Sequence, residues 1–310
     1  MQREVTFRSG DVTLAGSLVV PDAPRAVVVF AHGSGPLDRD ENTPAAALNV
    51  FNDLAARLAG EGIASLRYDK RGIGGSGGEF ASAGQNALAA DLLAAARFSM
   101  AEVPAPLHLC GHSEGTYLVA RVAREAGAAG LILVCPYLQR GDAVLMAQAA
   151  RVEATIRAMP GLRGWLARRW LDLRGWPVAT QARFIERMKD STAATLRQGG
   201  QDVPVTWLRD FALCDPAEAH GGHDLPTLIL PAEFDAQCDP ADGAAIAALG
   251  PNRTVTMLPA LSHILRRTGR ADVADYARQL GEPIAPAVGQ LIIDWMNRQI
   301  ETRDVEPGHD

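Results

Sequence analysis

Apolar residues along the chain form short continuous runs that alternate with segments of helical periodicity. The runs that predict strands lie at about 4–9, 13–21, 26–33, 63–69, 107–112, 130–136, 226–230 and 253–260. Helices are expected at about 85–98, at about 114–125 and over the apolar face of residues 288–295. Continuous apolar strands alternating with helices are typical of a doubly wound, mostly parallel sheet covered on both faces. The predicted fold class is therefore α/β.

A further helix is expected directly after the strand at 26–33. Thr43 suits its N-cap, Pro44 suits its first position and Gly60 suits its end. The apolar residues between these signals recur on one helical face: Leu48, Phe51, Leu54 and Leu58. The pattern predicts a helix of about four turns.

The alternation of strands and helices stops after Pro136. Residues 137–222 carry methionine, tryptophan and arginine at helical spacings without a clear strand, and we interpret this segment as a helical cap insertion. The core would then comprise 1–136 and 223–302, with 303–310 as a solvated C-terminal tail. A chain of 310 residues is near the upper limit for one hydrophobic core, which favours a single large domain with an insertion.

Composition and charge exclude several classes of partner. The net charge of −6 gives no basic footprint for nucleic acid. The N-terminal segment lacks the pattern of a signal peptide, and no apolar run approaches the roughly 20 residues that span a membrane, so a cytoplasmic location is expected. The four cysteines are widely spaced, which is typical of reduced core residues. Nothing in the sequence predicts the oligomeric state.

Ser113 stands between two glycines in the segment LHLCGHSEGTYLVA, residues 107–120. A strand-to-helix turn tight enough to project one side chain strains the backbone, and it leaves no room for side chains two positions away. Gly111 and Gly115 supply that room. Because a predicted strand precedes the motif and a predicted helix follows it, G-x-S-x-G indicates a nucleophilic serine rather than one that only caps a helix.

A serine nucleophile needs a base that is held by a third group. In a sheet of this kind the acid follows a later strand and the histidine follows the next one. Among the seven histidines, only His263 follows a predicted strand on the correct edge of the sheet. The candidate acids after the strand at 226–230 are Glu233, Asp235 and Asp239. We prefer Asp235, with Asp239 as second choice, because Asp239 precedes a proline as an N-cap would.

Acyl transfer also needs backbone N–H donors for the developing oxyanion. One should be the N–H of Glu114, which follows the serine. The second is expected from HGSGP at 32–36, with Ser34 preferred over Gly33. A free Glu114 carboxylate would oppose the oxyanion, so its side chain should be paired, and we expect Arg71 or Arg39 as the partner.

Two other signals are weak. Gly72, Gly74 and Gly77 spell G-x-G-x-x-G, but a loop rather than a helix follows them, so a dinucleotide site that uses Asp91 is not expected. The second signal is an irregular cluster of Cys214, Asp215, His220 and His223. Its spacing is not that of a metal site, and no metal or other cofactor is expected.

The chain resembles the α/β-hydrolase superfamily, and within it the bacterial carboxylesterases with GHSEG at the serine turn. The resemblance is carried, in order, by HGSGPLDRDEN, LRYDKRGIGGSGG, GHSEG, WLRDFALCDP, AEFDAQ and LSHIL. It implies Ser113 as nucleophile, Asp235 as acid and His263 as base. The chain departs from this group at three positions: Thr116 and Ala232 replace glycines, and Cys238 replaces a valine.

The expected function is hydrolysis of small carboxylic esters through an acyl-enzyme intermediate. The resemblance implies short acyl chains. Thioesterase, amidase and peptidase activities use the same machinery and stay open as alternatives. A non-catalytic binding protein that kept the scaffold is a further alternative, against which the complete serine, aspartate and histidine set argues.

Overall fold

The computed structural model describes residues 1–305 and divides into two compact units. Unit 1 comprises residues 1–80, 87–138 and the chain from Ala217 on, and unit 2 comprises residues 81–86 and 139–216. Among residues 1–305, no helix is long and apolar enough to cross a membrane.

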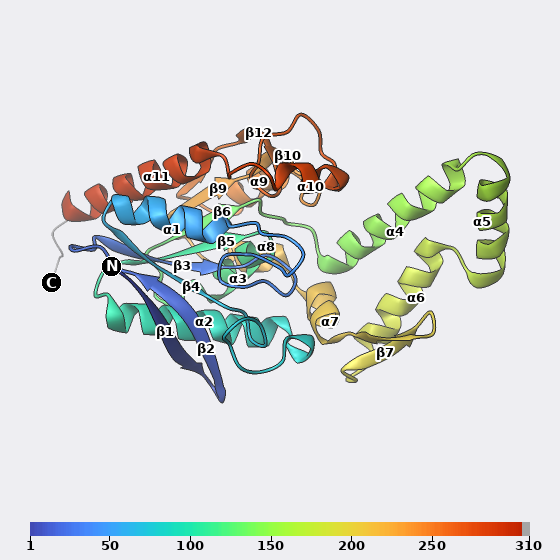
Figure 1. The fold of residues 1–310 in the computed structure, drawn as a ribbon, viewed down its shortest axis with the longest axis horizontal. Helices are drawn as coiled ribbons and strands as arrows, with labels where there is room; N and C mark the ends of the chain where they lie inside the picture. Colours follow the sequence, from blue (N-terminus) through green and yellow to red (C-terminus); the bar gives the residue numbers. More distant parts are fainter. Residues whose placement is uncertain (306–310) are drawn as a thin grey trace. The chain divides into compact units, whose positions relative to one another are not determined.

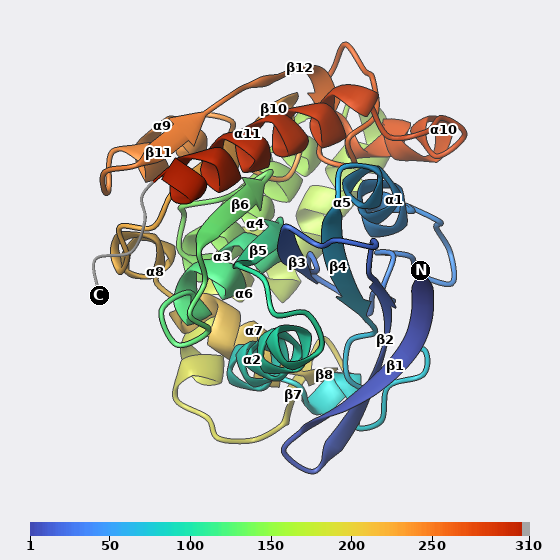
Figure 2. The same cartoon turned by 90° about the vertical axis from the view of Figure 1, so that its left-hand side faces the viewer.

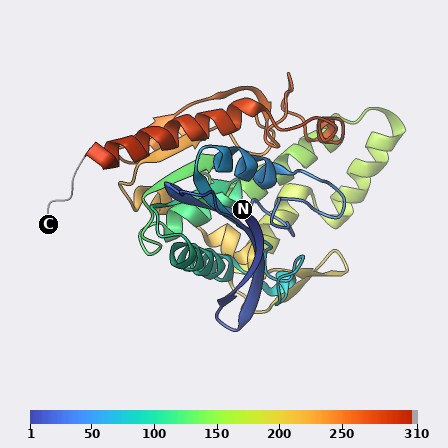
Figure 3. The ribbon, with the colours of Figure 1, turned by 60° about the vertical axis from the view of Figure 1, so that its left-hand side comes forward.

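Unit 1 is built on an eight-stranded sheet with helices on both faces. Its strands, in the order in which they lie across the sheet, are β1 (Gln2–Ser9), β2 (Val12–Val19), β4 (Ile63–Tyr68), β3 (Ala26–Ala31), β5 (Leu107–His112), β6 (Gly130–Val134), β9 (Thr227–Leu230) and β11 (Arg253–Val255). The β1–β2 hairpin forms one edge of the sheet (Figure 3), and β2 runs antiparallel to β4. The neighbouring pairs from β4 to β11 are parallel. The predicted doubly wound, mostly parallel sheet is confirmed.

Helices cover this sheet because its central strands are apolar on both sides. Every residue of β3, β4, β5, β6 and β9 is buried. Helices α1 (Val50–Gly60) and α11 (Pro286–Val305) lie on one face, and α2 (Gln85–Glu102) and α3 (Glu114–Val122) lie on the other (Figure 2). Because α11 continues to Val305, the expected tail at 303–310 begins as helix, and its remainder lies outside the described residues.

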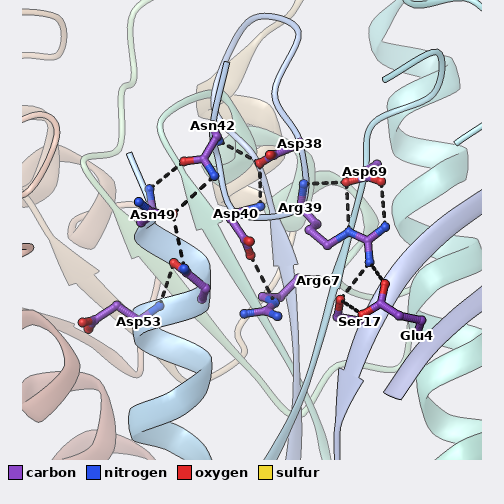
Figure 4. Close-up of polar contacts among 11 residues, drawn as sticks. Glu4, Ser17, Asp38, Arg39, Asp40, Asn42, Asn49, Asp53, Arg67 and Asp69 are labelled. Atoms are coloured by element: carbon purple, nitrogen blue, oxygen red, sulfur yellow. Dashed lines mark hydrogen bonds and ion pairs between the residues drawn. The ribbon is translucent and has the colours of Figure 1, made fainter. Parts of the chain in front are cut away.

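The helix expected from Thr43 begins only at Val50. The preceding loop is held by its own polar side chains, which bind the backbone in non-helical turns (Figure 4). Asp38 Oδ1 accepts the N–H groups of Asp40 and Asn42, while Thr43 pairs with Ala46 in an isolated bridge. The helical signals at Thr43 and Pro44 were therefore overridden by local side-chain bonds.

Two charge pairs fasten this loop to the sheet (Figure 4). The Arg39 guanidinium binds both carboxylate oxygens of Asp69, at 3.1 and 2.8 Å, and also contacts Glu4 and Ser17. Arg67 lies 3.4 Å from Asp40. The loop is thereby attached to β1, to β2 and to the end of β4.

The predicted strand at 253–260 is two strands. After β11, the chain forms β12 (Leu258–Ser262), which pairs in parallel with β10 (Ala232–Phe234) outside the large sheet. Phe234 is aligned with Ser262 in this pair. The residues that follow each strand, Asp235 and His263, are therefore brought to the same place.

The other elements of unit 1 are short and follow the strands. They are α8 (Pro216–Gly221), which begins at the last residue of unit 2, α9 (Asp242–Ala247), the 3-10 turn η2 (Val273–Asp275) and α10 (Tyr276–Gln279). A further 3-10 turn, η1 (Phe80–Ser82), lies at the first boundary between the units.

Unit 2 consists of helices and one hairpin. Its helices are α4 (Gly141–Ala158), α5 (Gly161–Arg174), α6 (Pro177–Lys189) and α7 (Thr206–Leu213) (Figure 1). The expectation that this segment lacks a strand is wrong, because β7 (Thr195–Gln198) and β8 (Gln201–Pro204) pair antiparallel. Gly199 and Gly200 turn between them at φ +58° and +87°, as a two-residue hairpin turn requires.

Helix α5 turns an apolar face to solvent. It buries Gly164 and Leu171, while the large apolar side chains on its other sides stay exposed: Leu162, Trp165, Leu166, Trp170 and Leu173. At 3.6 residues per turn Leu162, Leu166 and Leu173 project roughly opposite Leu171, and Trp165 and Trp170 lie to either side of them. The hydrophobic cluster at the core of unit 2 is small, and its buried members are Phe184, Met188, Val205 and Ala212.

Candidate active site

Ser113 lies at the turn between β5 and α3 in a strained conformation, with φ 54° and ψ −119°. The two flanking glycines are sterically required. A Cβ on Gly111 would come within 2.3 Å of the Gly115 carbonyl oxygen, and one on Gly115 would come within 2.0 Å of the Ala31 carbonyl oxygen. Such a turn, held by its neighbours, is the geometry that presents a serine at the edge of a parallel sheet.

Asp235 and His263 form a buried pair. The Oδ2 atom of Asp235 lies 2.7 Å from Nδ1 of His263, and the two side chains are 1% and 5% exposed. The other carboxylate oxygen, Oδ1, accepts the backbone N–H groups of Gln237 and Cys238 at 2.7 and 2.8 Å. Both carboxylate oxygens are therefore committed, and the imidazole is held in one orientation.

Burial alone would raise the pKa of Asp235. The opposing effects of His263, through its charge and hydrogen bond, and of the N–H groups of Cys238 and Gln237 keep the pKa below its usual value. Asp235 is therefore ionised at neutral pH and can hold the Nδ1 proton of the imidazole.

The other two acidic candidates point elsewhere. Glu233 accepts the N–H of Ala260 at 2.7 Å, and Asp239 accepts the N–H of Ala241 at 2.9 Å in the turn that leads into α9. Both side chains are used to fix the backbone. Of the three, Asp235 is the one that the structure brings to His263.

Cys238 lies close to this pair and to Ser113. Burial raises the pKa of the Cys238 thiol well above its usual value, and the side chain of Ser113 opposes this effect. The thiol belongs to a group of three potential ligand atoms, from Asp235, Cys238 and His263, that all lie within 4.8 Å of one another. Asp235, Cys238 and His263 therefore form one cluster beside Ser113. Apart from its departure from the resembling group, Cys238 carried no signal that sequence reasoning could have used.

The loop that begins at His32 lies against Ser113. A Cβ on Gly33 would be 3.3 Å from Cβ of Ser113, so this position needs a small residue. The N–H of Gly33 donates to Oε1 of Glu41 at 2.8 Å. Ser34, the next residue, is exposed.

The expected arginine partner of Glu114 is wrong. Arg71 binds Asp91 with two hydrogen bonds, at 2.7 and 2.5 Å, and Arg39 binds Asp69. The cation beside Glu114 is instead Lys70, whose Nζ lies 3.7 Å from Oε2 of Glu114. The prediction placed the positive charge on the correct loop but one residue too late.

Lys70 also fixes the neighbouring loop. Its Nζ donates to the carbonyl oxygens of Gly33 and Gly35, at 2.5 and 3.1 Å. Burial lowers the pKa of Lys70, while the charges of Glu114 and Glu41 oppose this effect. One buried ammonium thus neutralises Glu114 and orients two backbone carbonyls next to Ser113.

Sequence reasoning missed a buried ion pair behind the cluster. Oε2 of Glu41 lies 2.8 Å from Nδ1 of His112, and Nε2 of His112 donates to the carbonyl oxygen of His263 at 3.0 Å. Burial opposes both charges, but the pairing raises the pKa of His112 and lowers that of Glu41. With the Gly33 N–H on its other oxygen, Glu41 connects the loop beside Ser113 to the backbone of His263.

The two weak sequence signals have structural roles. Gly74 has φ +54°, and a Cβ there would come within 2.5 Å of Asp69, so this glycine accommodates the carboxylate that binds Arg39. His220 and His223 are buried, and Arg253 donates to the backbone carbonyl of each. Within residues 1–305, the two sets of three side chains close enough to share an ion both contain His263 and neither of these histidines.

The fold and the serine turn define the class: this is an α/β-hydrolase. The family model described as serine aminopeptidase, S33, matches residues 22–266, and the chain belongs to that family.

Individual relatives are more distant. The esterase EstD of Thermotoga maritima is 24% identical over 238 residues, which are 67% of this chain and 56% of EstD, so the chain spans little more than half of that protein's length. The solved structure of Est1E from Butyrivibrio proteoclasticus with ferulic acid superimposes with a TM-score of 0.62 at 17% identity, over 96% of this chain and 99% of Est1E. The hydrolase GrgF from Penicillium sp. sh18 gives a TM-score of 0.62 at 16% identity, over 97% and 99%. These similarities confirm the fold.

Proposed function

We propose that this protein is a carboxylic ester hydrolase in which Ser113 is the nucleophile, His263 the base and Asp235 the orienting acid. The observation that carries the proposal is the buried pair of His263 and Asp235, 2.7 Å apart, together with a serine on a strained strand-to-helix turn. The esterase name of the Thermotoga maritima relative supports an ester as substrate.

In the proposed reaction, Ser113 Oγ attacks the ester carbonyl as His263 takes its proton. Asp235 holds the imidazole through Nδ1 and stabilises its charged form. The N–H groups of Glu114 and Ser34 receive the developing oxyanion. Ser34 is favoured over Gly33 because the Gly33 N–H already donates to Glu41. His263 then protonates the leaving alcohol, and water releases the acid by the reverse sequence.

Lys70 removes an obstacle to this chemistry. A carboxylate on the residue that supplies an oxyanion donor would repel the transition state. The ammonium of Lys70 lies 3.7 Å from Glu114, so the charge nearest the donor is compensated.

Amide or peptide hydrolysis is the second candidate, because the matching family model is described as a serine aminopeptidase. The same three side chains serve both reactions, and the pocket for the leaving group decides between them. The cytoplasmic location and the preference for short acyl chains stay predictions.

A substrate panel tests the proposal. p-Nitrophenyl esters of increasing acyl length, a thioester, and aminoacyl p-nitroanilides are compared by kcat/KM. We expect the short esters to be hydrolysed fastest. A Ser113→Ala variant should lose at least about 10³-fold in kcat.

Ser191→Ala, in unit 2, is the matched control and should keep the activity of the original protein. A higher kcat/KM for the anilides than for the esters would mean that the protein is a peptidase and not an esterase. If a fluorophosphonate probe fails to label the folded protein, the chain is a non-catalytic binding protein.

A further inference from the structure

Cys238 is the unusual group of the cluster, because the proposed reaction gives it no role. It is partly exposed, whereas the other three cysteines are buried. Its sulfur lies within 4.8 Å of ligand atoms of Asp235 and His263. A thiol, an imidazole and a carboxylate at one point are the ligands that zinc takes in proteins.

The distances fit a small cation. Tetrahedral zinc with ordinary bond lengths holds its ligand atoms about 3.4–3.6 Å apart. The three atoms of this group are already within 4.8 Å, so shifts of about 1 Å complete the set. The imidazole–carboxylate bond of 2.7 Å would be exchanged for bonds to the ion. The proton on Nδ1 of His263 would then pass to Nε2 through solvent, and the thiol proton would leave to solvent as the metal–sulfur bond forms.

The neighbouring group of His112, Cys135 and His263 is a poorer site. Both ring nitrogens of His112 are already used, by Glu41 and by the carbonyl oxygen of His263. Binding an ion there would break a fully buried ion pair and leave Glu41 without its partner. In the group that contains Cys238, the bond between Asp235 and His263 is exchanged for bonds to the ion, so neither side chain is left without a partner.

We propose that Asp235, Cys238 and His263 form a binding site for a thiophilic divalent cation such as Zn²⁺, which reversibly switches off the hydrolase. An ion on His263 removes the base from the reaction, and an ion on Cys238 lies close to Ser113. The effect on hydrolysis rests on the proposed function, whereas binding of the ion does not.

The first experiment measures inhibition. Hydrolysis of a short p-nitrophenyl ester is followed at increasing Zn²⁺ in a buffer that does not chelate it, and then after EDTA. We expect at least a tenfold loss of rate at saturating ion, fully reversed by EDTA. Valine has a volume similar to that of cysteine and no sulfur. The same ion concentration should therefore slow the Cys238→Val variant by less than twofold, relative to the rate of that variant without the ion. Cys238→Ser provides a second variant if the valine disturbs folding, which circular dichroism will show.

The second experiment needs no activity. Co²⁺ is titrated into the full-length Ser113→Ala protein, and the thiolate-to-cobalt absorption band in the near ultraviolet is recorded. We expect one Co²⁺ per chain and loss of the band when Cys238→Val is added to this background. Cys135→Ala and Cys110→Ser should both keep it.

Absence of the band overturns the metal site, and so does a band that depends on Cys135 instead of Cys238. Inhibition of Cys238→Val equal to that of the original protein overturns it as well. If the band appears but no ester is hydrolysed, the result supports the ion site and contradicts the proposed esterase activity.

Discussion

The two units of this molecule differ in the charged and apolar side chains that they bury. Besides exposed ion pairs, unit 1 contains almost completely buried ones: the side chains of Glu41 and His112 are 0% and 5% exposed. In unit 2 the pair of Arg169 and Asp172 is 67% and 48% exposed. The same holds for apolar residues, since the central strands of unit 1 are fully buried while α5 turns five large apolar side chains to solvent.

This contrast explains why the candidate site lies in unit 1. Catalytic groups must be held to within a fraction of an ångström, and buried hydrogen-bonded charges resist displacement because moving them leaves an unpaired ion in a medium of low dielectric. Exposed pairs are screened by water and fix little. The precision of the His263 and Asp235 pair therefore depends on the buried network around it.

The largest expected effect on stability comes from removing one charge of that buried network. Glu41→Gln leaves the charged His112 buried without its counter-ion, so we expect the free energy of unfolding to fall by about 3–5 kcal/mol in urea denaturation. The same variant should lower kcat for esters, because His112 then holds the backbone of His263 less firmly.

The control is Asp172→Asn, which makes the same change from carboxylate to amide in an exposed pair of unit 2. No resolvable change in urea midpoint is expected. Equal losses in the two variants would show that burial does not distinguish the units.

The second effect is sensitivity to mild acid, between pH 7 and pH 5, which should be confined to unit 1 because unit 2 contains no histidine. Burial is the main cause that lowers the pKa of His32 to about 4, of His220 to about 3 and of His223 to about 4. Lys70 adds to the effect on His32, and the charges of Glu41 and Asp69 oppose it. Arg253 lies beside both other histidines, with Asp224 and Arg124 near His223.

These folded-state pKa values lie below the ordinary value of 6.5, so the stabilisation is complete above pH 6.5 and is lost as the pH falls toward 4. The loss should be about 3 kcal/mol for His32. Hydrogen exchange at pH 7 and pH 5 should show weaker protection in unit 1 peptides only, and His32→Gln should flatten the pH dependence of unfolding. Equal loss of protection in unit 2 would contradict this assignment.

The smallest effect is expected on α5. Leu173 is 87% exposed, so Leu173→Ala should change the free energy of unfolding by less than about 0.5 kcal/mol. The matched variant in unit 1 is Leu131→Ala, on a strand whose every residue is buried, and it should cost about 2–5 kcal/mol. Urea denaturation of both variants measures the difference, and a large loss at Leu173 would mean that its side chain is covered in solution.

The parts of the site that could be predicted from sequence are those that local sterics determine. The glycines around Ser113 indicated the strained turn because no other residue fits two positions away. Strand order placed Asp235 and His263 on one edge, and the pairing of Phe234 with Ser262 brings them together. Gly199 and Gly200 are an equally local signal for a hairpin turn. The helical spacing of the surrounding residues nevertheless led to the prediction of helix without strands.

The parts that could not be predicted depend on contacts between distant residues. The partner of Glu114 is Lys70 rather than Arg71, a choice made by how one loop packs against another. The start of α1 moved from Thr43 to Val50 because the polar side chains of the loop bind one another and the sheet. No periodicity in the sequence records such pairings.

The Glu41–His112–His263 connection also has a consequence for the order of folding. Glu41 and His112 are 71 residues apart in sequence, and His112 and His263 are 151 apart. Contacts between residues so far apart form late in folding, because the chain between them loses conformational entropy before the contact contributes any stabilisation. The serine turn, made of adjacent residues, can form early in refolding, whereas activity must wait for the longest closure. The recovery of hydrolysis after dilution from urea should therefore lag behind the recovery of secondary structure.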